Sequence, residues 1–406
     1  MRIIHTADWH LGHSLNGWSR ELEHEVFFSR LADLIDEQQA DLLVVAGDVF
    51  DSSNPSGETQ ELFYRTLARF KQRRPGLVTV ISGGNHDPAL RLEAPSPVLK
   101  ALDVHVVGTV KRRDGEIDIS RLLVPVTASG EVALYVLAIP FLRASDLTGL
   151  SFGDTDEQSP VVRSARAFFE EVTGKAQAVA GDVPILATAH LHCAGGLESE
   201  GAERRILIGG SHALPVNVFP DSLAYVALGH LHGQQTLGDG RVRYSGSCFP
   251  LSASEINHAH GVTLIEVTDG QARHRHIAID HPAPVLRIPR SGQIALDDLA
   301  AHLDAIEVDG DGPMGLRPIV YVELEATDAA AVLMSDAAKM VSERGLRLGG
   351  VRVHRKTPAA RTGGQPMVSL RQTTPEQLFV DAYSAKNDIA PEERHLSAFR
   401  DILVEG

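Results

Sequence analysis

The chain has 406 residues, of which 43% are hydrophobic and 22% are charged, and this composition excludes the disordered and fibrous classes of protein. The length exceeds that of most single cores, so one large domain with smaller additions is expected. The formal net charge of −15 excludes a protein whose whole surface binds a polyanion, so any contact with DNA must be local.

The N-terminus shows no export signal. Its first residues lead directly into a strand-like segment, without the basic and apolar regions of a secretory signal. No apolar run approaches the roughly 18 residues that span a bilayer, so a cytoplasmic protein without membrane contact is expected. Only Cys193 and Cys248 are present, which predicts reduced thiols rather than a disulfide framework or a cysteine metal site.

Residues 1–280 predict an α/β layered domain, because short apolar runs recur with helical patterns between the earlier ones. Apolar residues at helical spacing predict one helix over Glu21 to Gln38, and a second is predicted over Glu58 to Gln72. The predicted strands are Leu42 to Ala46, Leu77 to Ile81, Ala133 to Ile139, Ile185 to Ala187, Tyr225 to Leu228 and Val262 to Val267.

A second, small α/β domain is predicted over residues 285–356, after Pro282 and Pro284 interrupt the chain. Strand-like and helical segments alternate regularly here. The predicted strands are Val285 to Ile288, Ile319 to Leu324 and Leu346 to Val353, and the helices are Leu296 to Ile306 and Ala329 to Glu343.

Residues 366–406 predict a helical tail that follows a linker rich in Pro, Gly and Thr. Thr374 and Pro375 form an N-cap with proline at the first helical position, and a second amphipathic stretch runs from Leu396 to Leu403. Two short helices cannot bury their apolar faces alone, so they either fold back on the body or bind a partner. The pattern favours a partner.

Polar side chains follow the predicted strands at the point where each strand ends. Asp8 and His10 follow the first strand, Asp48 the second, and Asn85 and His86 the third. Histidines follow two later strands at the same position, namely His190, His230 and His232. Loops at the carboxyl ends of parallel strands converge on one crevice, so these residues are expected to share one site.

The ligand types predict a site for two divalent cations. Carboxylate, amide and imidazole groups without thiolate suit manganese best, with iron, zinc and magnesium as alternatives. Alternate residues of an extended segment point the same way, which explains the spacing of Asp8 and His10. Asp48 is the candidate bridging ligand, and two ions about 3.5–4 Å apart would clamp a phosphate.

Each of these residues also has a structural interpretation. Asp48 alone could cap a helix, and the segment Asn85 to Asp87 alone could form a turn. Five strand-end motifs of one ligand class together favour the metal site. His192 remains an alternative to His190, and Asp87 is expected to orient His86 or to cap a turn. The histidines expected to be structural or to lie outside the ligand set are His5, His13, His212, His258 and His260.

The ordered motifs resemble those of the calcineurin-like metallophosphoesterase superfamily. The motifs are Asp8-x-His10, Gly47-Asp48-Val49-Phe50-Asp51, Gly84-Asn85-His86-Asp87, Ala189-His190 and Gly229-His230-Leu231-His232. Within it, the segment from Met1 to Gly12 is similar to the opening of the SbcD family, the nuclease subunits of SbcC/SbcD complexes. The resemblance is clear over residues 1–280 and weaker in the tail.

This resemblance implies a DNA nuclease with double-strand exonuclease and single-strand or hairpin endonuclease activity, acting in DNA repair, recombination and replication. The implied ligands are Asp8, His10, Asp48 and His232 for one ion and Asp48, Asn85, His190 and His230 for the other. It further implies that His86 assists the leaving oxygen or stabilises the transition state.

The resemblance also implies a four-layer α/β/β/α sandwich with a capping domain and a homodimer within a heterotetramer. An SbcC-type ATPase subunit would be gripped by the C-terminal helices. The nearest alternative is a metallophosphoesterase acting on a small phosphodiester or a phosphoprotein, since the metal cluster does not name the substrate. A scaffold that positions DNA and a reader without chemistry are less favoured. Candidate basic patches for DNA lie at Lys71 to Arg74, Lys111 to Arg113 and Arg344 to Arg361.

Overall fold

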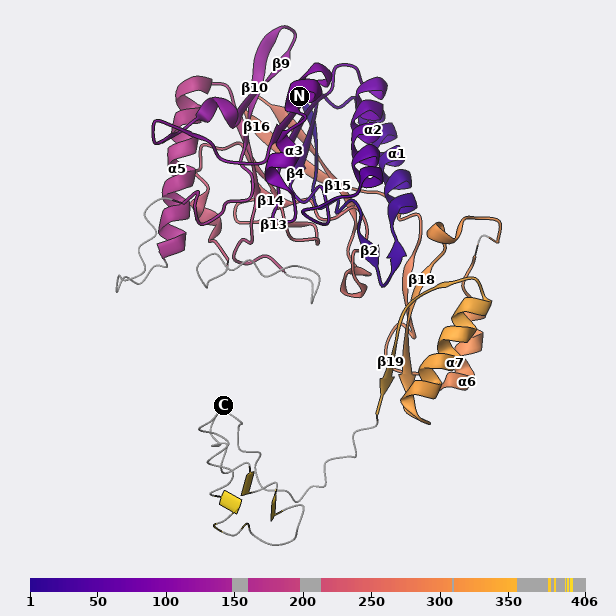
Figure 1. Ribbon diagram of the computed structural model, residues 1–406. Coiled ribbons are helices and arrows are strands. Elements are labelled where there is room, and N and C mark those ends of the chain that lie inside the picture. Colours follow the sequence, from indigo (N-terminus) through magenta and orange to yellow (C-terminus); the bar gives the residue numbers. More distant parts are fainter. Residues whose placement is uncertain are drawn as a thin grey trace. The chain divides into compact units, whose positions relative to one another are not determined.

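The computed structural model describes residues 1–147, 160–197, 213–308 and 310–355, together with a few positions between 379 and 396 (Figure 1). The chain divides into two compact units, Met1–His354 and Arg355–Gly406. In the second unit Phe379 and Tyr383 are helical and their rings lie 5.9 Å apart. Most of the predicted tail over 366–406, and His212, lie outside the described residues.

The first sheet has six strands in the order β16-β15-β1-β4-β5-β6. Strands β1, β4, β5 and β6 run parallel, while β15 pairs antiparallel with both β1 and β16. The strands are β1 (Arg2–Thr6), β4 (Leu42–Ala46), β5 (Val78–Ser82), β6 (Val104–Val107), β15 (Gly261–Thr268) and β16 (Gln271–Ala278). Helices α1 (Glu21–Glu37) and α2 (Gly57–Arg73) connect the first parallel strands, as in other parallel sheets.

The second sheet also has six strands, in the order β13-β14-β12-β11-β10-β9. Its four central strands run parallel and its two edge strands antiparallel. The strands are β9 (Leu123–Ala128), β10 (Glu131–Ala138), β11 (Ile185–His190), β12 (Tyr225–Gly229), β13 (Gln235–Leu237) and β14 (Val242–Tyr244). Helix α5 (Pro160–Ala180) precedes β11, and Figure 1 shows it on the opposite side of the body from α1 and α2.

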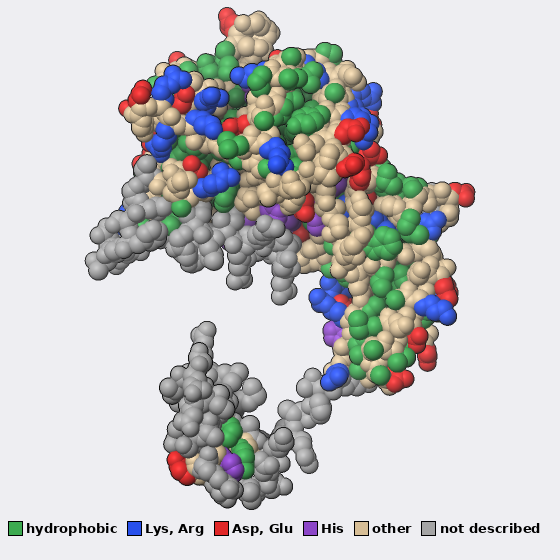
Figure 2. All heavy atoms as spheres, in the orientation of Figure 1, with side chains coloured by type: hydrophobic (Ala, Val, Ile, Leu, Met, Phe, Trp, Pro, Cys, Tyr) green, Lys and Arg blue, Asp and Glu red, His purple; other side chains and the backbone are tan. Residues whose placement is uncertain are grey.

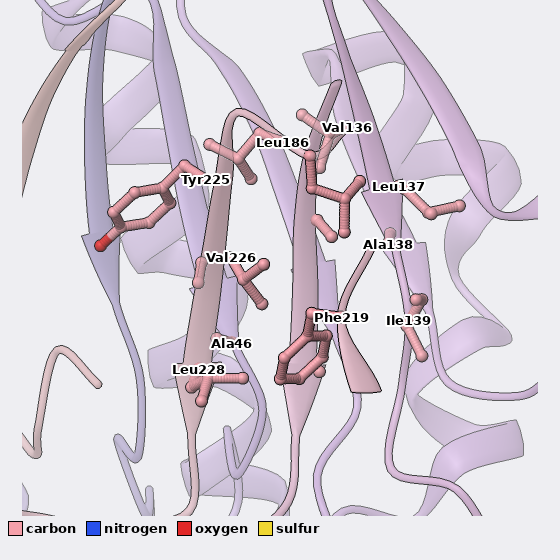
Figure 3. Packing of buried hydrophobic residues seen from close by; sticks show 14 of the residues in the cluster. Ala46, Val136, Leu137, Ala138, Ile139, Leu186, Phe219, Tyr225, Val226 and Leu228 are labelled. Carbon is pink, nitrogen blue, oxygen red and sulfur yellow. The ribbon is translucent and has the colours of Figure 1, made fainter. Parts of the chain in front are cut away.

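The side chains of β4 show how the two sheets and the helices share the core. Leu42 and Val44 belong to a hydrophobic cluster that includes the second sheet and α5, whereas Leu43 and Val45 belong to a cluster with α1 and α2. Alternate residues of a strand face opposite sides, so a continuous apolar run is required when both faces are buried. Figure 3 shows part of the first cluster, where residues such as Leu186 pack at close range.

Residues after 284 form a separate three-stranded parallel sheet in the order β17-β18-β19. Its elements are β17 (Val285–Ile288), α6 (Leu296–Asp304), β18 (Ile319–Glu325), α7 (Ala330–Glu343) and β19 (Arg347–His354). These elements have a hydrophobic cluster of their own, which includes Leu299, Val322 and Leu333. The predicted alternation of strands and helices is therefore present.

The small sheet contacts the main body through a buried group of charges. Glu23 of α1 accepts hydrogen bonds from Arg20 at 2.8 and 2.6 Å, from Arg347 of β19 at 2.9 Å, and from His281 at 2.8 Å. Arg20, Glu23 and Arg347 are fully buried. Such charges are tolerated inside a protein only when they are paired, so this cluster fixes β19 against α1.

A short hairpin makes a second contact with the small sheet. It is formed by β2 (Ser14–Leu15) and β3 (Trp18–Ser19), and its turn carries Asn16 and Gly17 at positive φ, as the tightest hairpin turns require. The Trp18 indole N–H donates to the Leu348 carbonyl oxygen at 2.8 Å. The hairpin is therefore tied to β19.

The remaining described elements are short. They are α3 (Ala89–Glu93), α4 (Ser96–Leu99), the strands β7 (Arg112–Arg113) and β8 (Glu116–Ile117), and 3₁₀ turns at Lys100–Leu102, Ile119–Arg121, Val216–Val218, Ala253–Glu255 and Met314–Leu316. None of the helices in the described part of the chain combines the length and apolar composition needed to cross a membrane.

Candidate metal centre

The carboxyl ends of β1 and β4 form the centre of the site. Asp8 donates its backbone N–H to the Gly47 carbonyl oxygen at 3.1 Å, and His10 donates to that of Asp48 at 3.0 Å. Asp8, His10 and Asp48 adopt φ values of 52°, 46° and 49°, a left-handed conformation that costs non-glycine residues about 1–3 kcal/mol. The surrounding hydrogen bonds therefore impose these conformations on three ligand-type residues. The extended segment predicted from the spacing of Asp8 and His10 was wrong, because the backbone is left-handed at both residues, yet both side chains reach the same candidate group.

Three overlapping groups of side chains in the described residues have ligand atoms within 4.8 Å of one another. They are Asp8 with His10 and His232, His10 with Asp48 and His86, and Asp8 with Asp48 and His190. The first sheet supplies four of these six residues, and the second sheet supplies His190 and His232. The predicted convergence of the strand ends is thus present in space.

Two buried ligand atoms at this centre have no hydrogen-bond partner. They are Asp8 Oδ2 and His10 Nε2, from side chains that are 0% and 4% exposed. Leaving a buried polar atom unsatisfied costs about 1–3 kcal/mol, so native proteins rarely tolerate two side by side. Burial also raises the pKa of Asp8 to about 7. A divalent cation would satisfy both atoms and favour the ionised carboxylate, so these residues fit a metal.

Asp48 presents one carboxylate oxygen to imidazoles on two sides. Its Oδ2 lies 3.2 Å from His190 Nε2 and 3.6 Å from His10 Nε2, while Oδ1 accepts the His86 backbone N–H at 2.8 Å. Burial alone would lower the pKa of His190, but the charge of Asp48 and its hydrogen bond raise it to about 9. The negative charge of Asp48 thus stabilises a positive charge placed beside it.

Asn85, in the loop after β5, is a further ligand candidate. Its Oδ1 lies 3.0 Å from His190 Nε2, while His190 Nδ1 donates to the Ala46 carbonyl oxygen at 2.9 Å. Because Nδ1 carries the proton of that bond, the Nε2 lone pair of a neutral His190 faces the oxygens of Asn85 and Asp48. Oxygens of Asn85 and Asp48 thus both lie within 3.2 Å of His190 Nε2.

His190 and His192 occupy different positions. His190 is buried within the groups described above, whereas His192 belongs to none of the three-residue groups found among the described residues, and its ring centroid is 6.3 Å from that of His230. The His230 ring lies 5.5 Å from the His190 ring, and its backbone N–H donates to Asp8 Oδ1 at 2.9 Å. Burial and the nearby His190 charge lower the pKa of His230, which favours the neutral, ligating form.

Two glycines of the motifs are required by close approach. A Cβ added to Gly84 would lie 2.1 Å from Asp48 Oδ1, and one added to Gly229 would lie 1.9 Å from the Ala46 carbonyl oxygen. Neither contact is possible for a side chain, and neither neighbour can move without displacing the strand ends. Gly84 thus allows the loop after β5 to approach Asp48, and Gly229 allows the end of β12 to approach the end of β4.

Comparisons with known proteins agree with this geometry. Residues 1–234 match the family model of the calcineurin-like phosphoesterases. The chain is 49% identical over 385 residues to the SbcD subunit of the SbcCD nuclease of Rhodobacter capsulatus, covering 94% of both chains. The chain belongs to the SbcD family of calcineurin-like phosphoesterases.

Other members of the SbcD family are more distant. Identity to the corresponding SbcCD nuclease subunit is 34% in Bacillus subtilis, covering 67% of both chains, and 31% in Escherichia coli K12, covering 80% of this chain and 78% of the relative. The family predicted from the ordered motifs is confirmed, and with it the class of phosphodiester hydrolase. A site for two metals is a property of this phosphoesterase fold, and the ligand groups of this SbcD-family chain suit it.

Two carboxylates that contact histidine Nδ1 atoms were not predicted. Asp51 Oδ1 lies 3.1 Å from both His10 Nδ1 and His13 Nδ1, and Glu255 Oε1 lies 2.9 Å from His232 Nδ1. A carboxylate that accepts the Nδ1 proton leaves Nε2 as the ligating atom and fixes the ring plane. Asp51 follows Asp48 within a motif, which gave a weak signal, whereas no sequence spacing pointed to Glu255.

Asp87 ties two strand-end loops together. Its carboxylate accepts backbone N–H groups from Gly84 at 2.7 Å, Val49 at 3.1 Å and Phe50 at 2.8 Å. Of the two roles expected for it, turn capping is the one these contacts support. Through this carboxylate the loop after β5 is fixed to the loop after β4.

Several other histidines have structural partners, as expected. His5 lies 3.2 Å from the Tyr225 hydroxyl and from the Leu228 carbonyl oxygen. His260 Nε2 lies 3.1 Å from the Glu255 carbonyl oxygen. These contacts link strands or loops around the centre without adding a ligand.

The first two predicted basic patches consist of side chains with local partners. Lys71 pairs with Asp103, Arg73 with Asp33, Lys111 with Glu93 at 3.7 Å, and Arg113 with Asp118 at 3.1 Å. In Figure 2 the Lys and Arg side chains (blue) are scattered among acidic ones (red) rather than gathered in one field. Neighbouring acids weaken the positive potential of such patches, which reduces their suitability for phosphate.

Proposed function

We propose that this chain is a metal-dependent DNA nuclease, the SbcD-type member of an SbcC/SbcD complex. The observation that carries the proposal is the pair of buried, unsatisfied atoms Asp8 Oδ2 and His10 Nε2 beside Asp48, in a chain 49% identical to a nuclease subunit over almost its whole length. A phosphoesterase centre of this kind hydrolyses phosphodiesters, and DNA is the substrate class favoured by the relatives.

The proposed ligand set divides between two Mn²⁺ ions. Asp8, His10, Asp48 and His232 would hold one ion, and Asp48, Asn85, His190 and His230 the other. Support comes from the overlapping ligand groups and from the position of Asp48 Oδ2 between the rings of His10 and His190. The mixture of hard oxygens and imidazole nitrogens suits Mn²⁺. When bound, the two ions would supply Lewis-acid stabilisation of the phosphate and a water of lowered pKa.

His86 is proposed to act on the leaving group. Its Nδ1 lies 2.7 Å from the Asp51 carbonyl oxygen, an acceptor that fixes the ring and leaves Nε2 available. The His86 ring centroid is 4.8 Å from that of His10, and His86 shares a candidate ligand group with His10 and Asp48, so its ring lies at the centre. From there His86 can donate a proton to the departing 3′ oxygen or stabilise its charge.

The domain division is proposed as a four-layer nuclease domain over 1–280, a capping domain over 285–356 and a partner-binding tail over 366–406. The separate sheet and core of residues 285–354 support the capping domain, which would help to sort single-stranded from double-stranded DNA. The tail would bind the SbcC-type ATPase. A homodimer within a heterotetramer is proposed from the resemblance to the SbcD family.

The test is nuclease activity of the full chain with added Mn²⁺ on linear duplex, hairpin and single-stranded DNA. Asp48→Asn should abolish cleavage, because it removes the carboxylate proposed to bridge both ions, whereas Asp33→Asn, a matched change at an exposed position of α1, should not. DNA that stays intact even with the ATPase subunit added, while a small chromogenic phosphodiester is hydrolysed, would overturn the nuclease proposal and favour a small substrate.

A further inference from the structure

Glu255 occupies a buried position behind His232, outside the ligand set. Its Oε1 accepts from His232 Nδ1 at 2.9 Å, and its side chain is 0% exposed. Among the described residues Glu255 belongs to none of the three-residue ligand groups. Its position is therefore behind the centre, where its carboxylate meets the ligand candidate His232.

The Glu255 carboxylate is itself fixed by further donors. Oε2 accepts the Leu251 backbone N–H at 2.9 Å, and Oε1 also accepts the Ser252 hydroxyl at 3.1 Å. The Glu255 carbonyl oxygen accepts from His260 at 3.1 Å. Because three donors hydrogen-bond to the Glu255 carboxylate, its orientation is fixed. A fixed carboxylate can in turn fix the plane of the His232 imidazole.

The loop that carries Glu255 is anchored from both sides. The Pro250 carbonyl oxygen accepts from Arg20 at 2.8 Å, and the Leu251 carbonyl oxygen lies 3.0 Å from His13 Nε2. The other nitrogen of His13 lies 3.1 Å from Asp51, the carboxylate that also contacts His10. The same loop is thus connected to two candidate ligands, directly to His232 through Glu255 and indirectly to His10.

We infer that Glu255 is a positioning residue that fixes the Nδ1-protonated tautomer and the ring plane of His232, and thereby sets the affinity of one of the two metal ions. The inference rests on the proposed function for the identity of the metal centre. Removal of a carboxylate that hydrogen-bonds to a ligating histidine lowers metal affinity by about 10–100-fold. A purely structural role for Glu255 would lower stability without that selective change.

The test is calorimetric titration of the metal-depleted full chain with Mn²⁺. In Glu255→Gln, one of two binding events should weaken by about 10–100-fold while the other changes little. Glu255→Asp, which keeps the charge, should recover part of the lost affinity. Glu93→Gln is the matched control, because Glu93 accepts hydrogen bonds from Gly108 and Thr109 away from the centre.

Thermal unfolding of each metal-depleted variant separates folding from binding. If Glu255→Gln does not fold, Ser252→Ala removes one donor to Glu255 Oε1 and should weaken the same binding event to a smaller extent. Mn²⁺ binding that is unchanged in the folded variant overturns the inference. A wild-type chain that binds two Mn²⁺ ions but does not cleave DNA when the ATPase subunit is present would contradict the nuclease function. The inferred role of Glu255 would not be affected by that result.

Discussion

Substitution of Glu23 by Gln should destabilise the chain strongly, because Glu23 is the carboxylate shared by Arg20, Arg347 and His281. The change leaves two fully buried guanidinium groups without a counter-charge. Breaking a buried ion pair by removing one partner costs about 3–5 kcal/mol, since the remaining charge stays desolvated.

The lowered pKa of Glu23 gives a second value for its contribution to the free energy of unfolding. Burial alone would raise this pKa, but hydrogen bonds from His281 and Arg20 and the charge of Arg20 lower it from 4.5 to about 2. That difference corresponds to about 3 kcal/mol of stability. Because the folded-state pKa is depressed, the contribution is complete above pH 4.5 and is lost as the pH falls toward about 2.

Urea unfolding followed by tryptophan fluorescence measures the effect. Trp9 is buried in the core that contains α1, and Trp18 is tied to β19, so both report on this region. Glu25→Gln on the same helix is the matched control, because its partner Arg65 is exposed and such pairs contribute at most about 1 kcal/mol. Equal midpoint shifts in the two variants, or a Glu23 effect that persists unchanged at pH 2, would refute the reasoning.

Two further predictions concern the centre and the tail. His86→Asn should abolish DNA cleavage while two Mn²⁺ ions remain bound, which metal analysis of the purified variant would check; loss of metal would make His86 a ligand instead. Deletion of residues 374–406 should abolish association with the ATPase subunit while hydrolysis of a small phosphodiester continues. Co-purification checks this, and a complex that survives the deletion contradicts the assigned role.

Two strands were predicted to the residue, for different reasons. Leu42–Ala46 is a continuous apolar run that is buried throughout. Val285–Ile288 is only partly buried, but Pro284 and Pro289 limit it on both sides. Strand β16 was not predicted, since its residues alternate with Arg and His and it forms a sheet edge. Helix α5 was not predicted either, although Phe168, Phe169 and Val172 repeat at helical spacing.

At the centre, strand-end position was sufficient to find the ligand-type residues but not the residues that orient them. Asp8, His10 and Asp48 were identified because parallel strands bring their carboxyl ends together. Glu255 lies 23 residues after His232 and meets it only through an irregular loop. No periodicity predicts such a contact, because it depends on how the loop packs against Arg20.

The ligand-type residues of the centre come from both six-stranded sheets, and this has a consequence for stability as well as for chemistry. Asp8 and Asp48 follow strands of one sheet, whereas His190 and His232 lie at the ends of strands of the other. An ion held by side chains from both sheets would link the two sheets at the carboxyl ends of these strands. A chelator that removed the ion would therefore also remove this link, and each further tenfold excess of free ion over its dissociation constant would add about 1.4 kcal/mol to the free energy of unfolding.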